Sequence, residues 1–155
     1  MNPILIVEDD DGIRGLLVEM LTRLGFETVT AINGEEGLTA FRKQPLDMVV
    51  TDIRMPVMDG LTMLKQIRRE NAIIPIIVVT AFPSVDSAVE SLSEGADDYL
   101  VKPINLTDLE SKVRKAMERR QIQRSLSKWK RIALVSIALI PLWFLLGIWL
   151  SRGLG

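Results

Sequence analysis

Five short apolar runs rich in Ile and Val, each followed by a stretch with helical spacing, divide the first 120 residues. Short continuous apolar runs are typical of buried parallel strands, and a regular alternation of strands with helices is typical of α/β proteins. The pattern therefore predicts a doubly wound, five-stranded parallel sheet with helices on both faces. The predicted strands are Ile4–Val7, Glu27–Thr30, Met48–Thr51, Ile76–Thr80 and Tyr99–Val101.

The stretches between the strands carry the signals that start and stop helices. Apolar residues recur at intervals of three and four from Ile13 to Leu24, and Gly25 then ends the pattern. Asn33 and Asn105 each stand three residues before an acid, which is the spacing of a helix N-cap and its partner. Apolar residues also recur at helical spacing from Leu61 to Ile67 and from Val85 to Leu92, before Gly95. Each predicted strand is thus followed by a predicted helix.

The composition excludes several kinds of chemistry. The chain has no Cys, so disulfides, thiolate metal sites and Cys nucleophiles are absent. It has no His either, which removes the commonest general base and the usual phosphoryl carrier. Mechanisms that depend on a Cys or His side chain of this chain are therefore excluded.

Acidic and polar residues stand where the predicted strands end. Glu8 and Asp9 follow the first strand, Asp52 the third, Thr80 ends the fourth and Lys102 follows the fifth. The carboxyl ends of parallel strands meet at one edge of the sheet, so we expect these side chains to converge. Three clustered carboxylates repel one another unless a cation joins them, and an all-oxygen ligand set suits Mg²⁺.

Such a site could carry out phosphoryl transfer. Asp52 would be the nucleophile and would form an aspartyl phosphate, with Mg²⁺ neutralising the incoming charge. Lys102 would supply a positive charge and Thr80 a hydroxyl donor for the phosphoryl oxygens. Each residue alone has a simpler explanation, because acids after strands are often N-caps or solvated loop residues. The conjunction of all five at successive strand ends favours the site.

Four segments carry a resemblance to a known family. They are Ile4–Arg14, Asp52–Gly60, Val78–Ala81 and Gly95–Pro103. With these motifs, residues 3–118 resemble a bacterial response-regulator receiver domain of the chemotaxis type. The resemblance implies a flavodoxin-like sheet with strand order 2-1-3-4-5, and a signalling domain that is not an enzyme.

The resemblance also implies roles for individual residues. Glu8 and Asp9 would hold Mg²⁺ together with Asp52 and the backbone carbonyl of Arg54, and Asp52 would be the phosphoacceptor. The switch residues would be the Thr80 hydroxyl and the Tyr99 ring, Lys102 would bind the phosphoryl group, and Pro103 would follow a cis peptide bond.

The implied partners follow from the same resemblance. The donor would be a sensor histidine kinase or a histidine phosphotransfer protein. Phosphorylation would alter the face made by the fourth and fifth helices, where a downstream protein or a second copy of the chain would bind.

A second feature is the run Ile132–Leu150, which is 19 residues long and contains no charge. As a helix it would span roughly 28 Å, close to the thickness of a bilayer's hydrocarbon core. Trp129 and Trp149 flank it at a spacing that suits the two interfaces, and Lys128 begins a basic flank on its N-terminal side. We therefore expect a single-pass helix in a bacterial inner membrane, with the receiver in the cytoplasm.

The expected organisation has four parts: residues 1–120 form the receiver, 121–131 a basic helical connector, 132–150 the transmembrane helix and 151–155 a short tail. The connector is too short for a helix-turn-helix unit, so we expect the partners to include the lipid bilayer but no nucleic acid.

Other interpretations stay open. The apolar run could pack against another protein, or belong to a longer membrane protein. The chain could be a phosphorylation-independent membrane scaffold. It could also be a phosphatase of the haloacid-dehalogenase type. Those enzymes carry an Asp-x-Asp motif at the nucleophile, whereas here Arg54 stands where the second Asp of that motif would be.

Overall fold

The computed structural model describes residues 2–81, 85–122 and 125, with the backbone alone for 85–88. Internal contacts divide the chain into two compact units, Met1–Arg120 and Gln121–Gly155. The predicted transmembrane helix at 132–150, the tail at 151–155 and most of the connector at 121–131 lie outside the described residues. Within the described part of the chain, no helix combines the length and the apolar character needed to cross a membrane.

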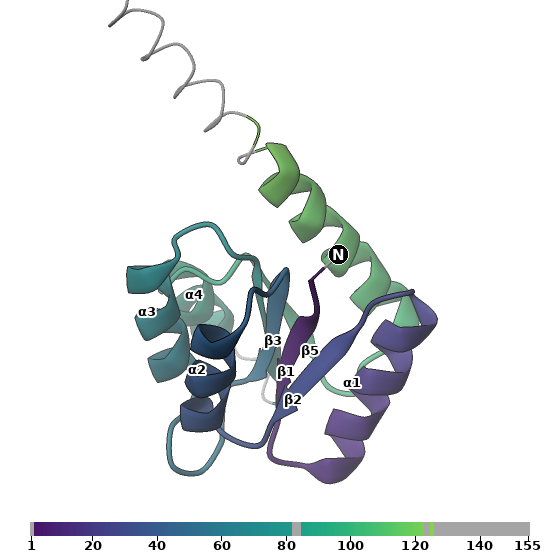
Figure 1. Ribbon diagram of the computed structural model, residues 1–155. Helices are drawn as coiled ribbons and strands as arrows, with labels where there is room; N and C mark the ends of the chain where they lie inside the picture. The colour runs from purple at the N-terminus through teal and green to yellow at the C-terminus, as the bar shows by residue number, and fades with distance from the viewer. Residues whose placement is uncertain (1, 82–84, 123–124, 126–155) are drawn as a thin grey trace, which may run out of the picture. The chain divides into compact units, whose positions relative to one another are not determined.

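The first unit is an α/β fold in which strands and helices alternate (Figure 1). The elements are β1 (Ile4–Val7), α1 (Asp11–Arg23), β2 (Thr28–Ala31), α2 (Gly34–Lys43), β3 (Met48–Asp52), α3 (Gly60–Glu70), β4 (Ile76–Thr80), α4 (Val85–Ser93) and β5 (Asp98–Val101). A last helix covers residues 106–122. The five strands form one parallel sheet in the order β2-β1-β3-β4-β5. This confirms the expected sheet and its order.

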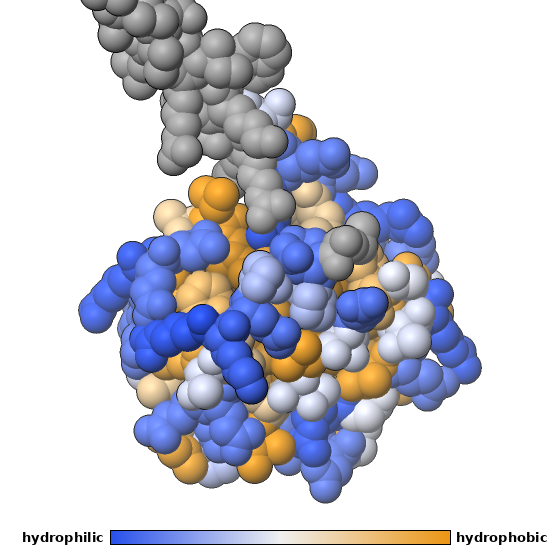
Figure 2. Space-filling model, in the orientation of Figure 1, coloured by the Kyte–Doolittle hydropathy of each residue, from blue (hydrophilic) through white to orange (hydrophobic). Residues whose placement is uncertain are grey.

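Alternate residues of the strands feed two separate cores, one on each face of the sheet. Ile4 and Ile6 of β1 pack with α1 and with the helix at 106–122, whereas Leu5 and Val7 pack with α2 and α3. Figure 1 shows the same division, with α2, α3 and α4 on the face opposite α1. Figure 2 shows hydrophilic residues over much of the face in view, with apolar residues scattered between them. Both faces of the sheet are thus covered.

Side-chain caps begin four of the helices. The accepting residues are Asp10 from the Ile13 amide (2.8 Å), Asn33 from Glu36 (2.9 Å), Asp59 from Thr62 (2.7 Å) and Asn105 from Asp108 (2.7 Å). The caps predicted at Asn33 and Asn105 are confirmed. Asp10 follows β1 as Glu8 and Asp9 do, but its carboxylate caps α1 and has a structural role.

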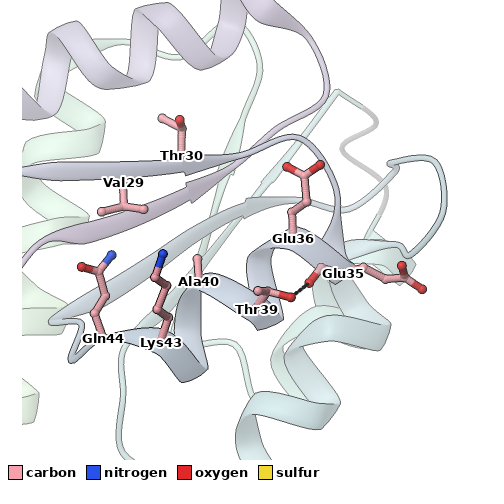
Figure 3. A pocket seen from close by; sticks show the side chains of 8 residues that line it. All are labelled: Val29, Thr30, Glu35, Glu36, Thr39, Ala40, Lys43 and Gln44. Atoms are coloured by element: carbon pink, nitrogen blue, oxygen red, sulfur yellow. Dashed lines mark hydrogen bonds between the residues drawn. The ribbon is translucent and has the colours of Figure 1, made fainter.

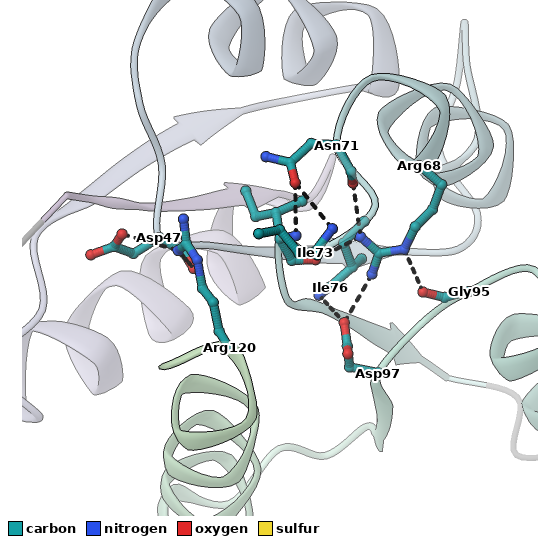
Figure 4. A network of polar contacts seen from close by, with 9 residues as sticks. Asp47, Arg68, Asn71, Ile73, Ile76, Gly95, Asp97 and Arg120 are labelled. Carbon is teal, nitrogen blue, oxygen red and sulfur yellow. Dashed lines mark hydrogen bonds and ion pairs between the residues drawn. The ribbon is translucent and has the colours of Figure 1, made fainter. Parts of the chain in front are cut away.

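Two arginines, the partly buried Arg68 and the buried Arg120, tie helices to the edge of the sheet where the strands begin (Figure 4). Arg68 of α3 donates to the carbonyls of Gly95 (2.7 Å) and Ile74 (2.6 Å), and to Asp97 (2.9 Å). Asp97 also accepts from the Ile76 amide at 2.8 Å. This network fixes the turn between α4 and β5 against α3.

The second arginine is Arg120, which is 5% exposed. Its guanidinium donates to the Asp47 carboxylate at 3.0 Å, to the Leu46 carbonyl at 3.0 Å and to the Asp47 carbonyl. Asp47 in turn accepts from the backbone amide of Asn2 at 2.8 Å. The helix at 106–122 is thereby fastened to the loop that leads into β3.

Candidate functional site

Three carboxylates converge where β1 and β3 end. Ligand oxygens of Glu8, Asp9 and Asp52 lie within 4.8 Å of one another. β1 and β3 are neighbours in the sheet, which explains the convergence. Glu8 is 1% exposed and Asp52 is 8% exposed, whereas Asp9 is open to solvent. The sequence prediction that these acids share one edge is confirmed.

Lys102 lies between two of the carboxylates. Its Nζ is 2.8 Å from Glu8 Oε2 and 3.2 Å from Asp52 Oδ2. The sequence assigned this lysine to the phosphoryl oxygens alone, and the structure adds that it already offsets the charge of Glu8 and Asp52. The bond between Lys102 and Pro103 is cis, as expected.

The electrostatics of the cluster follow from its burial. Burial raises the pKa of Glu8 and the neighbouring Asp52 acts in the same direction, while Lys102 opposes them without cancelling the rise. For Lys102, burial lowers the pKa, but the Glu8 and Asp52 carboxylates raise it by more, so it lies above its ordinary value. The lysine is therefore a fixed cation at neutral pH.

The donor set fits a divalent hard cation. Glu8 Oε2 is buried and has no partner in hydrogen-bond geometry, although Lys102 Nζ lies 2.8 Å away as an ion pair. Asp9 adds a carboxylate that is exposed and close to the other two. Oxygen ligands of this kind, with room for water, are those that Mg²⁺ prefers.

The loop after β3 holds Asp52 in place. Asp52 Oδ1 accepts from the Ile53 amide at 2.8 Å, and the Gly60 amide donates to the Ile53 carbonyl at 2.9 Å. Gly60 opens α3 directly over the end of β3, where a Cβ would lie only 1.9 Å from the Asp52 carbonyl oxygen. Only glycine allows this approach.

The same loop contains a tight turn at Val57. The Met58 amide donates to the Pro56 carbonyl at 2.8 Å, and Val57 between them has a φ of 69°. A three-residue turn with positive φ is strained, and more so for a β-branched residue. Arg54 lies in this loop with an exposed side chain, and its carbonyl as a metal ligand stays a prediction.

The remaining predicted residues lie on β4 and β5. Thr80 ends β4, is 5% exposed and accepts the Lys102 amide at its carbonyl (2.8 Å). Tyr99 pairs with Val78, two positions before Thr80, and is half-buried. Thr80 and Lys102 thus lie at the same edge of the sheet as Asp52. Tyr99 lies farther from that edge, beside Val78.

Arg14 is a site residue to which the sequence analysis gave no role. It donates to the Glu8 carbonyl at 2.8 Å and forms an ion pair with Asp11. It therefore orients the turn that presents Glu8 and Asp9. The sequence offered one indication of this role, namely that Arg14 follows several acids near the start of a predicted helix.

Two of the hollows on the described surface can be compared with the position of the site. The first, between β2 and α2, is lined by Val29, Thr30, Glu35, Glu36, Thr39, Ala40, Lys43 and Gln44 and contains none of the acidic site residues (Figure 3). The second borders the site and is lined by Ile13, Leu16, Lys102, Pro103 and Ile104. The second hollow is mostly apolar and offers a contact surface beside Lys102.

Comparison with known proteins agrees with this geometry. The family model described as "Response regulator receiver domain" matches residues 4–114. The "Probable transcriptional regulator ycf27" of Pyropia yezoensis is 42% identical over 116 residues, which are 75% of this chain and 47% of that protein. The "Regulatory protein AtoC" of Escherichia coli K12 is 40% identical over 126 residues, which are 81% of this chain and 27% of that protein.

A solved structure gives the same result. The receiver domain protein from Clostridium thermocellum superposes with a TM-score of 0.75 at 30% identity, and the match covers 79% of this chain and 99% of that one. The chain spans about half the length of the ycf27 relative and about a quarter of the AtoC relative. The similarity therefore concerns the unit that carries the acidic site.

Proposed function

The chain belongs to the response regulator receiver family, and on that premise we propose that it accepts a phosphoryl group on Asp52 from a phosphohistidine donor. The observation that supports this most directly is the convergence of Glu8, Asp9 and Asp52 at one edge, with Lys102 between two of them. The chain has no His, so the donor is a sensor histidine kinase or a histidine phosphotransfer protein.

The residues at the edge have distinct roles in this proposal. Asp52 attacks the phosphorus, and the bond from phosphorus to the donor nitrogen breaks in line with the new bond. Lys102 moves from the two carboxylates to the phosphoryl oxygens, and the Thr80 hydroxyl donates to one of them. Glu8, Asp9, Asp52 and the Arg54 carbonyl would hold Mg²⁺, which supplies positive charge for the phosphoryl oxygens when bound.

The second hollow suits the donor. Ile13, Leu16 and Ile104 provide an apolar surface directly beside Lys102, and Leu16 is 39% exposed. A helical donor packing there would bring its histidine to the edge that carries Asp52.

The output in this proposal is a change of a protein-binding face. Val89 and Leu92 of α4 are exposed apolar residues, as is Val101 of β5, the strand that also carries Tyr99. When Thr80 turns to the phosphoryl group, Tyr99 turns toward the space it leaves, and this face changes. A downstream protein or a second copy would bind there.

The expected absence of nucleic-acid contact finds no support in the comparisons, since the matched relatives include proteins named transcriptional regulators.

We also propose that residues 132–150 tether the domain to the inner membrane, with the receiver in the cytoplasm. The support is the sequence alone: 19 uncharged residues, flanked by Trp129 and Trp149, after the basic residues Lys128, Lys130 and Arg131. Tethering would raise the effective concentration of the switch beside a membrane kinase.

The phosphoacceptor assignment is tested by mass spectrometry of the full chain with Mg²⁺ and acetyl phosphate. The parent should gain one phosphoryl group that hydroxylamine removes, and Asp52→Asn should gain none. Asp108→Asn, which changes an exposed acid elsewhere, should behave like the parent. An adduct on Asp52→Asn would refute the assignment, and a parent that gains no adduct would favour the phosphorylation-independent scaffold.

The metal is tested by thermal melts with and without Mg²⁺. A cation that binds only the folded chain raises its stability by RT ln(1 + [Mg²⁺]/Kd), so the parent should melt at a higher temperature in millimolar Mg²⁺. Asp9→Asn and Asp52→Asn should each weaken this response, and the double variant should lose it.

The phosphatase alternative is distinguished by turnover. A phosphatase of the haloacid-dehalogenase type would hydrolyse many phosphate esters per chain, whereas a phosphoacceptor stops at one phosphoryl group per chain.

The tether is tested by fractionation. The full chain should stay in membranes after a high-salt wash, because salt screens Lys128, Lys130 and Arg131 but leaves apolar burial intact. Extraction by salt alone would place the chain on the membrane surface instead.

A further inference from the structure

Lys112 connects the two faces of the sheet around its edge strand β5. It lies on the helix at 106–122, whose Leu109 and Val113 are buried in the core on the α1 side. Its Nζ reaches Asp98 Oδ1 at 2.6 Å and lies 5.5 Å from the centre of the Tyr99 ring. Tyr99 packs against the opposite core, with α2 and α3. One side chain thus joins the last helix to a ring on the far face.

The strand geometry explains how this contact arises. Among the described residues β5 pairs only with β4, so its other side is open to a side chain that passes around it. Successive residues of a strand point to opposite faces, so Asp98 lies on the face of the helix and Tyr99 on the other. Asp98 Oδ1 also accepts from the Tyr99 amide at 2.9 Å, which holds the carboxylate beside the ring.

The contact is partly shielded from water. The side chains of Lys112 and Asp98 are 27% and 19% exposed. An ammonium within about 6 Å of a ring centre is attracted by the ring's electrons, and shielding strengthens the attraction. Nothing in the phosphotransfer chemistry uses Lys112, because it touches neither the carboxylates nor Thr80 among its described contacts.

We propose that Lys112 is a positioning residue that holds the Tyr99 ring at the edge of the sheet before phosphorylation. This rests on the proposed function, in which Tyr99 turns toward Thr80 when Asp52 is phosphorylated. Lys112 then sets how often the ring leaves the edge without phosphate. Loss of the ammonium should raise the ratio of inward to edge orientations by about two- to five-fold.

The chain is well suited to a direct test, because Tyr99 is its only tyrosine. The full chain is labelled with 3-fluorotyrosine, and its fluorine resonance is measured without phosphate in H₂O and in D₂O. The difference between the two shifts reports the solvent exposure of the ring. Removing a charge beside the ring changes the fluorine shift equally in H₂O and in D₂O. Turning the ring inward changes its solvent exposure, and therefore the difference between the two shifts.

Four variants give a decision. Lys112→Met removes the ammonium beside the ring, and Asp98→Asn removes the carboxylate that holds this ammonium in place. Both changes should lower the solvent exposure of the ring, because the ring turns inward more often. Lys112→Arg keeps a cation over the ring and should restore the parent value. Lys115→Met, an exposed lysine on the same helix, should leave it unchanged. Equal or greater exposure in Lys112→Met would overturn the proposal, as would the same change in Lys115→Met.

The two proposals fail separately. The ring measurement uses chains without phosphate, so a parent that acetyl phosphate does not modify would refute the phosphoacceptor role and leave the ring result standing. A parent that gains its phosphoryl group while Lys112→Met shows the parent's ring exposure would refute only the role of Lys112.

Discussion

The carbonyl oxygen of Asp52 occupies the space where a side chain on Gly60 would begin, since a Cβ there would lie 1.9 Å away. The first residue of α3 is therefore packed directly onto the backbone of Asp52, one of the three clustered carboxylates. The atom in the way belongs to a buried strand, so it has little freedom to move.

Gly60→Ala should destabilise the domain by about 3 kcal/mol or more, because the backbone of β3 or α3 must shift. It should also slow phosphorylation of Asp52 by displacing its loop. Gly15→Ala is the matched control, since a Cβ on Gly15 meets nothing within 4 Å. Gly15 lies inside α1, so that change should stabilise by about 0.5–1 kcal/mol. Urea unfolding of both variants measures the difference, and equal effects would contradict the close contact at Gly60.

Val57→Gly should raise stability by roughly 1 kcal/mol, because glycine removes the strain of a positive φ at a β-branched residue. Val57 is 75% exposed, so little packing is lost with its side chain. Val89→Gly, at an exposed helical position, should instead lower stability by about 1 kcal/mol. Thermal melts of the two variants should move in opposite directions, and a loss of stability in both would argue against strain at Val57.

Arg120→Met should cost about 3–5 kcal/mol, because it leaves the largely shielded Asp47 carboxylate without its cation and two carbonyls without a donor. Arg114→Met is the control, since Arg114 pairs with Glu110 on the exposed surface of the same helix. That pair should contribute well under 1 kcal/mol. Denaturant titration distinguishes the two, and a small effect at Arg120 would mean that the helix is held by its apolar face alone.

Glu70→Gln should lower stability only above the acid range. The hydrogen bond from Arg42 lowers the pKa of Glu70 below the ordinary value of a glutamate. A group with a depressed folded-state pKa contributes stability above the unfolded value, and that contribution is lost as the pH falls through the folded value. The stability difference between parent and variant should therefore be constant at neutral pH and vanish in acid. A difference that persists in strong acid would assign it to packing.

The local patterns of the sequence predicted the strands well because each strand is an apolar run with clear ends. β2 begins and ends one residue later than expected, at Thr28 and Ala31, and β3 continues to Asp52. The carboxylate cluster was predictable as well, since strand ends in a parallel sheet share an edge.

Contacts between residues far apart in the sequence were not predictable. Arg120 and Asp47 are separated by 73 positions, and Arg68 and Asp97 by 29. Each is an ordinary charged residue in its own segment, and its burial depends on how helices settle on the sheet. The bridging position of Lys102, and the reach of Lys112 around β5, were missed for the same reason.

The fastening of Arg120 to Asp47 also fixes where the polypeptide leaves the domain. Asp47 immediately precedes β3, whereas Asp52 is the last residue of that strand, so the residue that binds Arg120 and the acidic cluster lie at opposite ends of the strand, about 17 Å apart. Arg120, the last residue of the first compact unit, is therefore held at the end of the sheet where the strands begin, away from the acidic cluster.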